Sequence, residues 1–246
     1  MIITSVDNKK IKKYYSLKTN KGRKEWGLFL IEGEHLCEEA YKNHLLVDLL
    51  TEEGEKLSFN YHDEITYVTS NILKKLSSLV NHNKIIGVCK MMNYYEIKGN
   101  HILLLDDIQD PGNLGTIIRS SKAFDIDTII LSLNSVDIYN DKVLRSSEGM
   151  IFNSNIIYGD LEDVILKLKK DNYLILGTNV NNGLDVKNIK PEKYALIMGN
   201  EGKGVKEKLL NLCDKQLYIK MNKDCESLNV AVATSILLYE LRGNHE

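Results

Sequence analysis

The 246-residue chain lacks the features of a membrane-spanning, disulfide-rich or disordered protein. No apolar run reaches the roughly 18 to 20 residues needed to cross a bilayer, and the first residues lead into lysines without the apolar core of a signal peptide. The four cysteines form no CxxC pair, which argues against a zinc site and a disulfide framework. Hydrophobic residues make up 43% of the chain, enough for one large core or two modest ones. We therefore expect a globular cytoplasmic protein that binds no membrane and no metal.

An excess of charge is also missing, since 32 Lys and Arg against 34 Asp and Glu leave a formal net charge of −2. This balance excludes a uniformly basic surface that binds polyanions by bulk attraction. The distribution is uneven, because residues 1–24 hold eight basic side chains and one acid, a local charge of +7. One interpretation is a surface that contacts phosphates. The other is a solvated amphipathic helix whose apolar side chains pack inward, namely Ile11, Tyr14, Tyr15 and Leu17.

The pattern of apolar segments divides the chain into two α/β domains. Short strand-like segments and helical spacing alternate up to residue 90, and a polar stretch over 91–100 predicts a boundary. From residue 101 onward, unbroken apolar strands alternate with amphipathic helices, which is typical of a parallel sheet covered on both faces. We predict a small domain over residues 1–95 and a larger one over 101–246.

The individual elements follow from the same patterns. Strands are expected at 28–31, 45–50, 66–68, 85–89, 102–105, 128–131, 174–177, 195–198 and 217–219. Helices are expected at 33–41, 71–76 with Ser70 as N-cap, 114–124, 141–147, 161–170 and 230–242. The only two prolines, Pro111 and Pro191, are each expected in a turn.

The loop after the strand at 102–105 is the first of three that stand out at carboxyl ends of strands, where open α/β sheets collect function. A turn of Asp-Pro-Gly is followed by Asn113, Gly115 and Arg119 on the next helix. Asn113 could cap that helix, and Gly115 would allow close approach of a neighbour. The alternative is an ordinary strand-turn-helix junction with a surface arginine.

The second loop places Gly199, Gly202 and Gly204 around Asn200-Glu201. Three glycines in six residues indicate a backbone bent around a ligand, although a plain loop stays possible. A phosphate loop is excluded, because the GK[ST] ending is missing and Glu201 would repel a phosphate. The GxGxxG order of a dinucleotide fold is also missing, which argues against a nicotinamide-dependent dehydrogenase.

The third loop reads CESLN and opens a helix that begins Val-Ala-Val-Ala-Thr. These small residues let the helix pack closely, in a core or against a second subunit. Ser227 as the N-cap would explain the serine without any function.

Taken in order, the three loops resemble the motifs of the SpoU/TrmH family of RNA ribose 2'-O-methyltransferases, members of the SPOUT class. The family motif N-x-G-x-x-x-R is matched by Asn113, Gly115 and Arg119, the second motif by MGNEGKG and the third by CESLNVAVA. The segment YNDKVLRSSEGM, which contains Arg145, is similar to a further family segment. FLIEGEHLCEEA is similar to the opening of a small substrate-binding domain, shaped like certain ribosomal RNA-binding proteins.

The resemblance implies a C-terminal domain with a trefoil knot and a homodimer whose active sites lie near the subunit interface. General rules of topology would instead give an unknotted, doubly wound sheet. The implied cofactor is S-adenosylmethionine, held chiefly by backbone groups. Its expected contacts are Thr178, Gly199, Asn200, Gly202, Ile219, Met221 and Leu228.

The implied reaction is attack of a ribose 2'-hydroxyl on the activated methyl group, in which positioning supplies much of the catalysis. A guanidinium stays protonated at neutral pH, so we expect Arg119 to grip a phosphate and stabilise the forming alkoxide rather than act as a base. Asn113 belongs to the same expected site, Glu201 would order the second loop or the arginine, and Ser227 and Asn229 would shape the third loop or meet RNA.

Ribosomal RNA, in particular 23S, is the expected substrate because a separate N-terminal domain precedes the catalytic one. The alternatives are a transfer RNA methyltransferase and a catalytically inactive RNA-binding protein, although the intact motifs argue against the second. RNA contacts are expected at Lys9, Lys10, Lys12, Lys13, Lys18 and Arg145.

Overall fold

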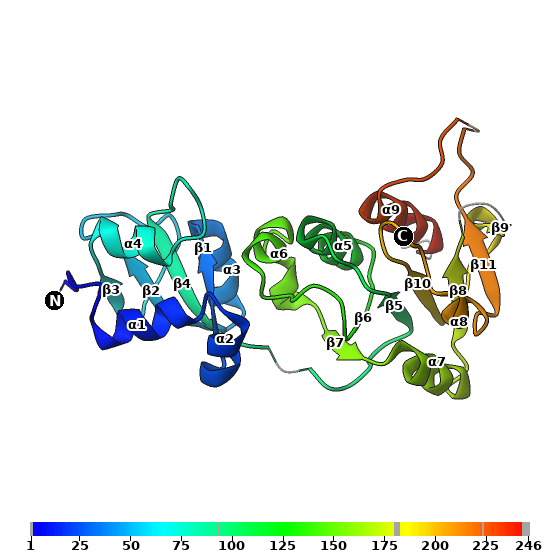
Figure 1. Ribbon diagram of the computed structural model, residues 1–246, viewed down its shortest axis with the longest axis horizontal. Helices are drawn as coiled ribbons and strands as arrows, with labels where there is room; N and C mark the ends of the chain where they lie inside the picture. The colour runs from blue at the N-terminus through cyan, green and yellow to red at the C-terminus, as the bar shows by residue number, and fades with distance from the viewer. Residues whose placement is uncertain (1, 93, 180–182, 223, 243–246) are drawn as a thin grey trace. The chain divides into compact units, whose positions relative to one another are not determined.

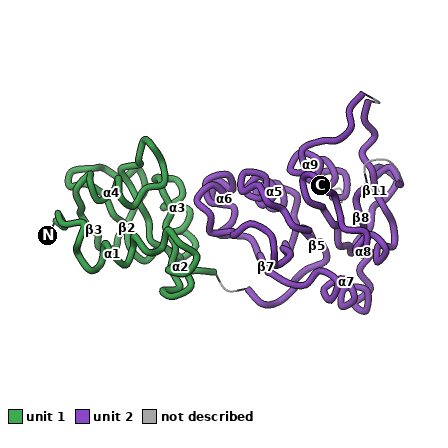
Figure 2. Tube along the Cα trace, viewed as in Figure 1, with its two compact units in different colours: residues 1–93 green, residues 94–246 purple. Residues whose placement is uncertain are grey.

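The protein consists of two compact units, Met1–Asn93 and Tyr94–Glu246 (Figure 2). The computed structural model describes residues 2–92, 94–179, 183–222 and 224–242. Within these ranges no helix combines the length and the apolar character needed to cross a bilayer.

The first unit is a four-stranded sheet in the order β1-β4-β2-β3, with β4 antiparallel to both of its neighbours and β2 parallel to β3. Its strands are β1 (Leu28–Glu32), β2 (Leu46–Thr51), β3 (Ile65–Tyr67) and β4 (Ile85–Lys90). Its helices are α1 (Lys9–Ser16), α2 (Asn20–Trp26), α3 (Glu34–Lys42) and α4 (Ser70–Leu76).

The lysine-rich segment forms the amphipathic helix α1. Ile11, Tyr14 and Leu17 are buried in a core cluster with residues of α4 and the sheet. Tyr15, expected to pack inward with them, is instead 47% exposed, because it follows Tyr14 by 100° around the helix and leaves the buried face. Helix α2 was not predicted, although the side chain of Thr19 caps its start and Gly27, in the left-handed region with φ 62°, ends it.

The second unit is a seven-stranded parallel sheet in the order β7-β6-β5-β10-β8-β11-β9. Its strands are β5 (His101–Leu105), β6 (Thr128–Ser132), β7 (Ile156–Gly159), β8 (Leu174–Thr178), β9 (Leu184–Asp185), β10 (Tyr194–Met198) and β11 (Lys215–Tyr218). Its helices are α5 (Pro111–Ala123), α6 (Asp141–Ser146), α7 (Leu161–Lys170), α8 (Glu207–Leu210) and α9 (Val230–Leu241), with short 3-10 helices η1 (Met150–Asn153) and η2 (Val186–Asn188).

Helices cover both faces of this sheet, as the unbroken apolar strands predict. Helices α5, α6 and α9 lie over one face, and α7 and α8 lie over the other (Figure 1). Every residue of the central strand β10 is buried. A hydrogen bond of 2.7 Å between the hydroxyls of Ser120 and Ser235 joins α5 to α9.

Three predicted helix caps are wrong. Thr69, not Ser70, occupies the N-cap position of α4, and Ser70 is the first residue of that helix. Asp110, not Asn113, is the N-cap of α5, since its side chain accepts from the backbone N–H of Asn113. Pro111 is the first residue of this helix rather than part of a preceding turn, a position that suits its fixed φ and missing N–H. Asn229, not Ser227, caps α9 through the backbone N–H groups of Ala231 and Val232.

The other differences concern short elements. Strands β7 and β9 and helix α8 span four residues or fewer, too few for a period of apolar residues to show. The longer predicted helices and strands of this unit are confirmed within three residues at each end.

Candidate active site

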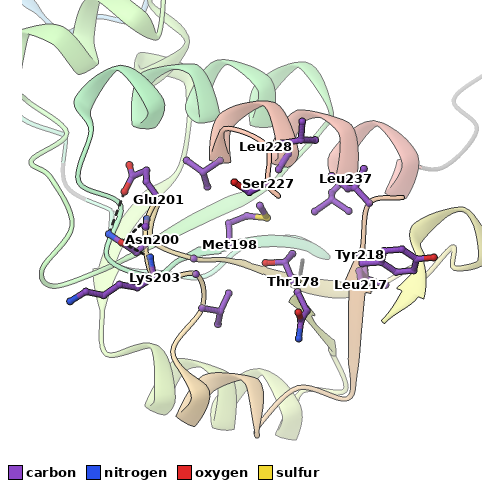
Figure 3. A pocket seen from close by; sticks show the side chains of 18 of the residues that line it. Thr178, Met198, Asn200, Glu201, Lys203, Leu217, Tyr218, Ser227, Leu228 and Leu237 are labelled. Carbon is purple, nitrogen blue, oxygen red and sulfur yellow. Dashed lines mark hydrogen bonds between the residues drawn. The ribbon is translucent and has the colours of Figure 1, made fainter. Parts of the chain in front are cut away.

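A pocket of about 460 Å³ lies at the carboxyl ends of β8, β10 and β11, beside the start of α9 (Figure 3). This size falls within the range of roughly 300–1,000 Å³ that is typical of ligand pockets. Glu201 and Tyr218 lie at opposite ends of the view, with Met198 between them. The lining includes every residue expected to contact the cofactor, namely Thr178, Gly199, Asn200, Gly202, Ile219, Met221 and Leu228.

The glycine loop after β10 closes on itself through its backbone. The N–H groups of Asn200 and Gly204 each donate to the carbonyl of the other, at 3.0 and 2.9 Å. A Cβ on Gly199 would lie 2.1 Å from Gly204 C and from Val205 N, so no side chain fits there. Gly204 has φ +68°, in the region that favours glycine. The loop is therefore a preformed turn whose shape depends on glycine at two positions.

Glu201 connects this glycine loop to the loop that opens α5. Its Oε1 accepts hydrogen bonds from the backbone N–H of Asp110 at 3.0 Å and from Asn113 Nδ2 at 3.1 Å. Both of its carboxylate oxygens also lie 3.3 Å from the N–H of Gln109. The carboxylate thus accepts from two consecutive backbone groups and from two side-chain amides, those of Asn113 and, at 3.3 Å, Asn200. It therefore fixes the position of the first loop.

The side-chain amide of Asn113 extends these hydrogen bonds to the third loop. Asn113 Oδ1 accepts from Asn229 Nδ2 at 2.9 Å, while Asn229 Oδ1 accepts from the N–H of Ala231 at 2.9 Å and so caps α9. One chain of hydrogen bonds, from Glu201 through Asn113 to Asn229, therefore joins all three loops that stand out in the sequence. We call these three residues the loop network.

The charge of Glu201 suits this role. Burial acts to raise its pKa, but the hydrogen bonds donated by Asp110, by its own N–H and by Asn113 outweigh burial and bring the pKa below the ordinary value of 4.5. The carboxylate is therefore ionised at neutral pH and serves as an acceptor rather than as a proton donor.

Replacing Glu201 with Gln should test the loop network through its pH dependence. A carboxylate with a lowered folded-state pKa stabilises the fold above its unfolded-state pKa, and this contribution is lost as pH falls through the folded-state value. We expect the substitution to lower Tm at pH 7 by about 2–4 °C, the shift for about 1 kcal/mol in a chain of this size. The difference should shrink when unfolding is followed below about pH 4. An equal difference at every pH would mean that the ionised carboxylate is not what matters.

A second tie to the glycine loop was not predicted. Asp106 directly follows β5 and is 1% exposed. It accepts from the backbone N–H of Lys206 at 2.9 Å and from its Nζ at 2.8 Å. Lys206 Nζ also pairs with Asp107 at 2.6 Å. A buried carboxylate is stable when it is paired and hydrogen-bonded in this way. Nothing in the sequence distinguishes Lys206 from a surface lysine.

Further lining residues were also missed. Leu217 and Leu237 give the pocket an apolar wall, and Tyr218 also lines it, with its ring extending away from Met198 and Thr178 (Figure 3). Leu237 lies in the third turn of α9, where it cannot be told from a core leucine by sequence. Tyr218 ends β11 and could have been found by the rule that selected the three loops.

Arg119 lies apart from this pocket. It stands in the third turn of α5, is exposed, and makes no hydrogen bond or ion pair with any residue that the structure describes. Ser227, in contrast, lines the pocket together with Glu201. Of the five residues expected to form the catalytic site, four are thus joined by the pocket or the loop network, and Arg119 is joined to neither.

The basic residues expected to contact RNA fall into three groups. Lys10 Nζ pairs with the buried Asp48 at 2.8 Å, and Lys18 Nζ donates to the carbonyl of Ser77 at 2.6 Å, so both stabilise the first unit. Arg145 pairs with Asp141 on α6 at 2.8 Å, and the exposed Lys12 pairs with Asp7 at 2.9 Å. Lys9 and Lys13 form no ion pair with the described part of the chain.

Within the described ranges, no group of three or more His, Cys, Asp or Glu residues is placed to hold a metal ion. The four cysteines are free thiols, and Cys37 and Cys89 are buried in the first unit.

Known proteins resemble the chain over nearly its whole length. Residues 100–239 match the SpoU rRNA Methylase family, and residues 8–87 match the MRM3-like substrate binding domain. The 23S rRNA (guanosine(2553)-2'-O)-methyltransferase RlmP of Bacillus subtilis is 36% identical over 245 residues, covering 98% of this chain and 99% of that protein.

Solved structures also resemble this chain over nearly its whole length. The crystal structure of an RNA 2'-O ribose methyltransferase superposes with a TM-score of 0.84 at 28% identity, covering 98% of each chain. The AdoMet-bound rRNA methyltransferase from Sinorhizobium meliloti gives a TM-score of 0.85 at 25% identity, covering 98% of this chain and 97% of that one. With a family match over more than half of its residues and a full-length relative, this chain belongs to the SpoU rRNA methylase family.

Proposed function

We propose that the protein transfers a methyl group from S-adenosylmethionine to the 2'-hydroxyl of a ribose in 23S ribosomal RNA. The observation that carries this proposal is the loop network beside a ligand-sized pocket, which joins the three family motifs at one end of the sheet. The full-length relative in Bacillus subtilis, a 23S rRNA 2'-O-methyltransferase, supports the choice of RNA. We assign RNA binding to the first unit and methyl transfer to the second.

The pocket suits S-adenosylmethionine in shape and chemistry. Apolar side chains such as Leu217 and Leu237 would hold the adenine, and the backbone of the glycine loop offers N–H and carbonyl groups to the polar parts. Lys203 also lines the pocket, but its side chain extends away from Met198 and Thr178 (Figure 3), so its ammonium group would not repel the positive sulfonium. When bound, the cofactor supplies a methyl group already activated by that sulfonium.

The chain's own residues then position the ribose. Ser227, at the edge of the pocket, and the loop network would hold the third loop in place for the substrate. Arg119 would bind the neighbouring phosphate with its guanidinium and stabilise the alkoxide that forms at O2'. The proton leaves to phosphate or water, because a guanidinium does not give up its own proton at neutral pH.

We propose that two copies of the chain form a homodimer through α9. Val232, Ile236 and Tyr239 are 48%, 36% and 51% exposed, and their spacing places them on one face of the helix. This apolar stripe adjoins α5, which carries the exposed Arg119. Pairing across it would bring the arginine of one copy near the pocket of the other and explain why one copy leaves Arg119 outside its own pocket.

Replacing Ile236 with Glu should therefore give a monomer that folds but does not transfer methyl groups. A buried unpaired carboxylate at the interface would cost several kcal/mol, enough to prevent pairing at micromolar concentration. Light scattering during size-exclusion chromatography gives the mass. Leu166→Glu on α7, whose side chain is 48% exposed on the other face of the sheet, serves as the matched control and should remain dimeric. A monomeric wild type, or a dimeric Ile236→Glu variant, would contradict this interface.

We also propose the trefoil knot that family membership implies. The position of β10 between β5 and β8 supports it, since the chain leaves β10, adds β11 beyond β8 and returns with α9 against α5. A cytoplasmic location is in keeping with a ribosomal RNA substrate.

Mapping of ribose methylation across total RNA, with and without the protein, tests the function directly. We expect one position in 23S ribosomal RNA to lose its methyl group, and the guanosine equivalent to the site of the Bacillus subtilis relative is the first to inspect. A lost site in transfer RNA would show the substrate assignment to be wrong. No lost site would favour a protein that binds RNA without modifying it.

A further inference from the structure

The outer face of α1 and α2 carries the chain's only tryptophan in an unusual setting. Trp26 ends α2 and is 46% exposed, and Lys13 Nζ lies over its ring at 4.4 Å from the centroid. The ring borders a shallow hollow whose other lining residues are Lys9, Lys10, Lys12, Lys13, Ser16 and Glu25. A large aromatic side chain left in water beside several cations indicates a binding surface rather than a core.

Two of these lysines are not used in ion pairs. Lys9 and Lys13 form none with the described residues, whereas Lys10 neutralises the buried Asp48. Lys12 pairs with Asp7, but both side chains are mostly exposed, so a phosphate can displace that contact at small cost. The hollow therefore presents positive charge next to an aromatic ring.

A second ring, on α1, repeats the arrangement. Tyr15 is 47% exposed, with Lys75 Nζ at 5.2 Å and Lys18 Nζ at 5.7 Å from its centroid. Helical spacing places Lys12 between Tyr15 and Lys9 around the exposed side of α1. The outer face thus carries two exposed rings, each with at least one ammonium group beside it.

Single-stranded RNA matches this pattern. Bases of a single strand stack on aromatic side chains, while its phosphates pair with lysines, and each stacked base contributes about 1–3 kcal/mol. A duplex keeps its bases stacked on one another and would leave the rings unused. An acidic peptide would satisfy the lysines but not the two exposed rings. The local charge of +7 over residues 1–24 is complementary to phosphate.

We propose that this α1–α2 face binds a single-stranded segment of the substrate RNA, with one base stacked on Trp26 and the adjoining phosphates held by Lys9 and Lys13. The identity of the ligand rests on the proposed function, which makes RNA the substrate. All the residues that form this face belong to the first unit.

Trp26 is also the probe for the test, because no second tryptophan contributes to the fluorescence of the full-length chain. Titration with a 12-nucleotide single-stranded RNA should quench the emission, and a duplex of the same sequence should quench it much less. Trp26→Ala should weaken binding of the labelled strand about tenfold in fluorescence anisotropy, while Trp26→Phe should retain most of the affinity. Tyr95→Ala, which removes a ring that is 82% exposed in the second unit, is the control and should bind as the wild type does.

The lysines are tested by salt dependence. Lys9→Ala with Lys13→Ala should reduce the slope of log K against log salt by about 1.4, because each phosphate that a lysine neutralises on a single strand accounts for about 0.7 of the slope. Lys56→Ala in the loop between β2 and β3 is the matched control and should leave the slope unchanged. An unquenched Trp26 at saturating RNA, an unchanged affinity of Trp26→Ala, or equal quenching by polyglutamate would each overturn the proposal.

A methyl-transfer assay on ribosomal RNA separates this inference from the function on which it rests. If the wild type methylates RNA and Trp26→Ala does so with unchanged kcat/KM, the α1–α2 face is not the binding surface and the function stands. If RNA quenches Trp26 but no methyl group is transferred, the binding surface stands and the proposed function falls. Circular dichroism and Tm show whether each variant is folded.

Discussion

Replacing Arg119 with Ala is expected to lower kcat for RNA methylation by about 10²–10³-fold, the usual effect of removing a group that stabilises a developing oxyanion. The affinity for S-adenosylmethionine should stay within about twofold of the wild type, because Arg119 does not line the pocket and makes no hydrogen bond or ion pair with a described residue. Transfer of a labelled methyl group measures the first quantity, and calorimetric titration of the cofactor measures the second.

Arg119→Lys tests whether the planar guanidinium is needed. Lysine keeps the charge but cannot form two parallel hydrogen bonds to a phosphate, so we expect most of the activity to be lost. Substantial activity of this variant at neutral pH would count against a bidentate role. A collapse of cofactor affinity in Arg119→Ala would instead show that the arginine supports the pocket.

Replacing Gly199 with Ala should weaken S-adenosylmethionine binding about 10- to 100-fold. The new methyl group would lie 2.1 Å from backbone atoms of Gly204 and Val205, and backbone cannot rotate away as a side chain can. The glycine loop would have to open, at the cost of about 1–3 kcal/mol that is typical of overpacking. Cofactor titration of the folded variant measures this loss.

Gly202→Ala is the matched control in the same loop. Its Cβ would meet only Asn200 Oδ1, at 3.8 Å, so the loop can keep its shape. We expect a loss of a few fold at most. If both variants bind S-adenosylmethionine equally weakly, glycine is needed at these positions for contact with the cofactor and not for closure of the loop. If both variants bind it normally, the loop does not form the cofactor site.

Much of the second unit could be predicted because its signals are local. The central strand β10 is apolar and buried throughout, and helices such as α7 show regular spacing, so the presence and type of these elements were confirmed. The caps were wrong for a local reason too. Asp110, Asn113, Ser227 and Asn229 are all good capping residues, and sequence cannot show which of two neighbours has the extended backbone that a cap requires.

The sequence by itself determined the two α/β patterns, the family motifs and the position of three unusual loops at strand ends. The tertiary structure decided which of those residues meet. Glu201 and Asn113 are 88 residues apart and Asn113 and Asn229 are 116 apart, yet their side chains lie within hydrogen-bond distance, because parallel pairing brings the carboxyl ends of separate strands to one edge. The structure likewise divided the lysines by their partners. Lys10 serves a buried carboxylate, whereas Lys13 lies over Trp26, a difference that depends on distant residues and not on the composition of α1.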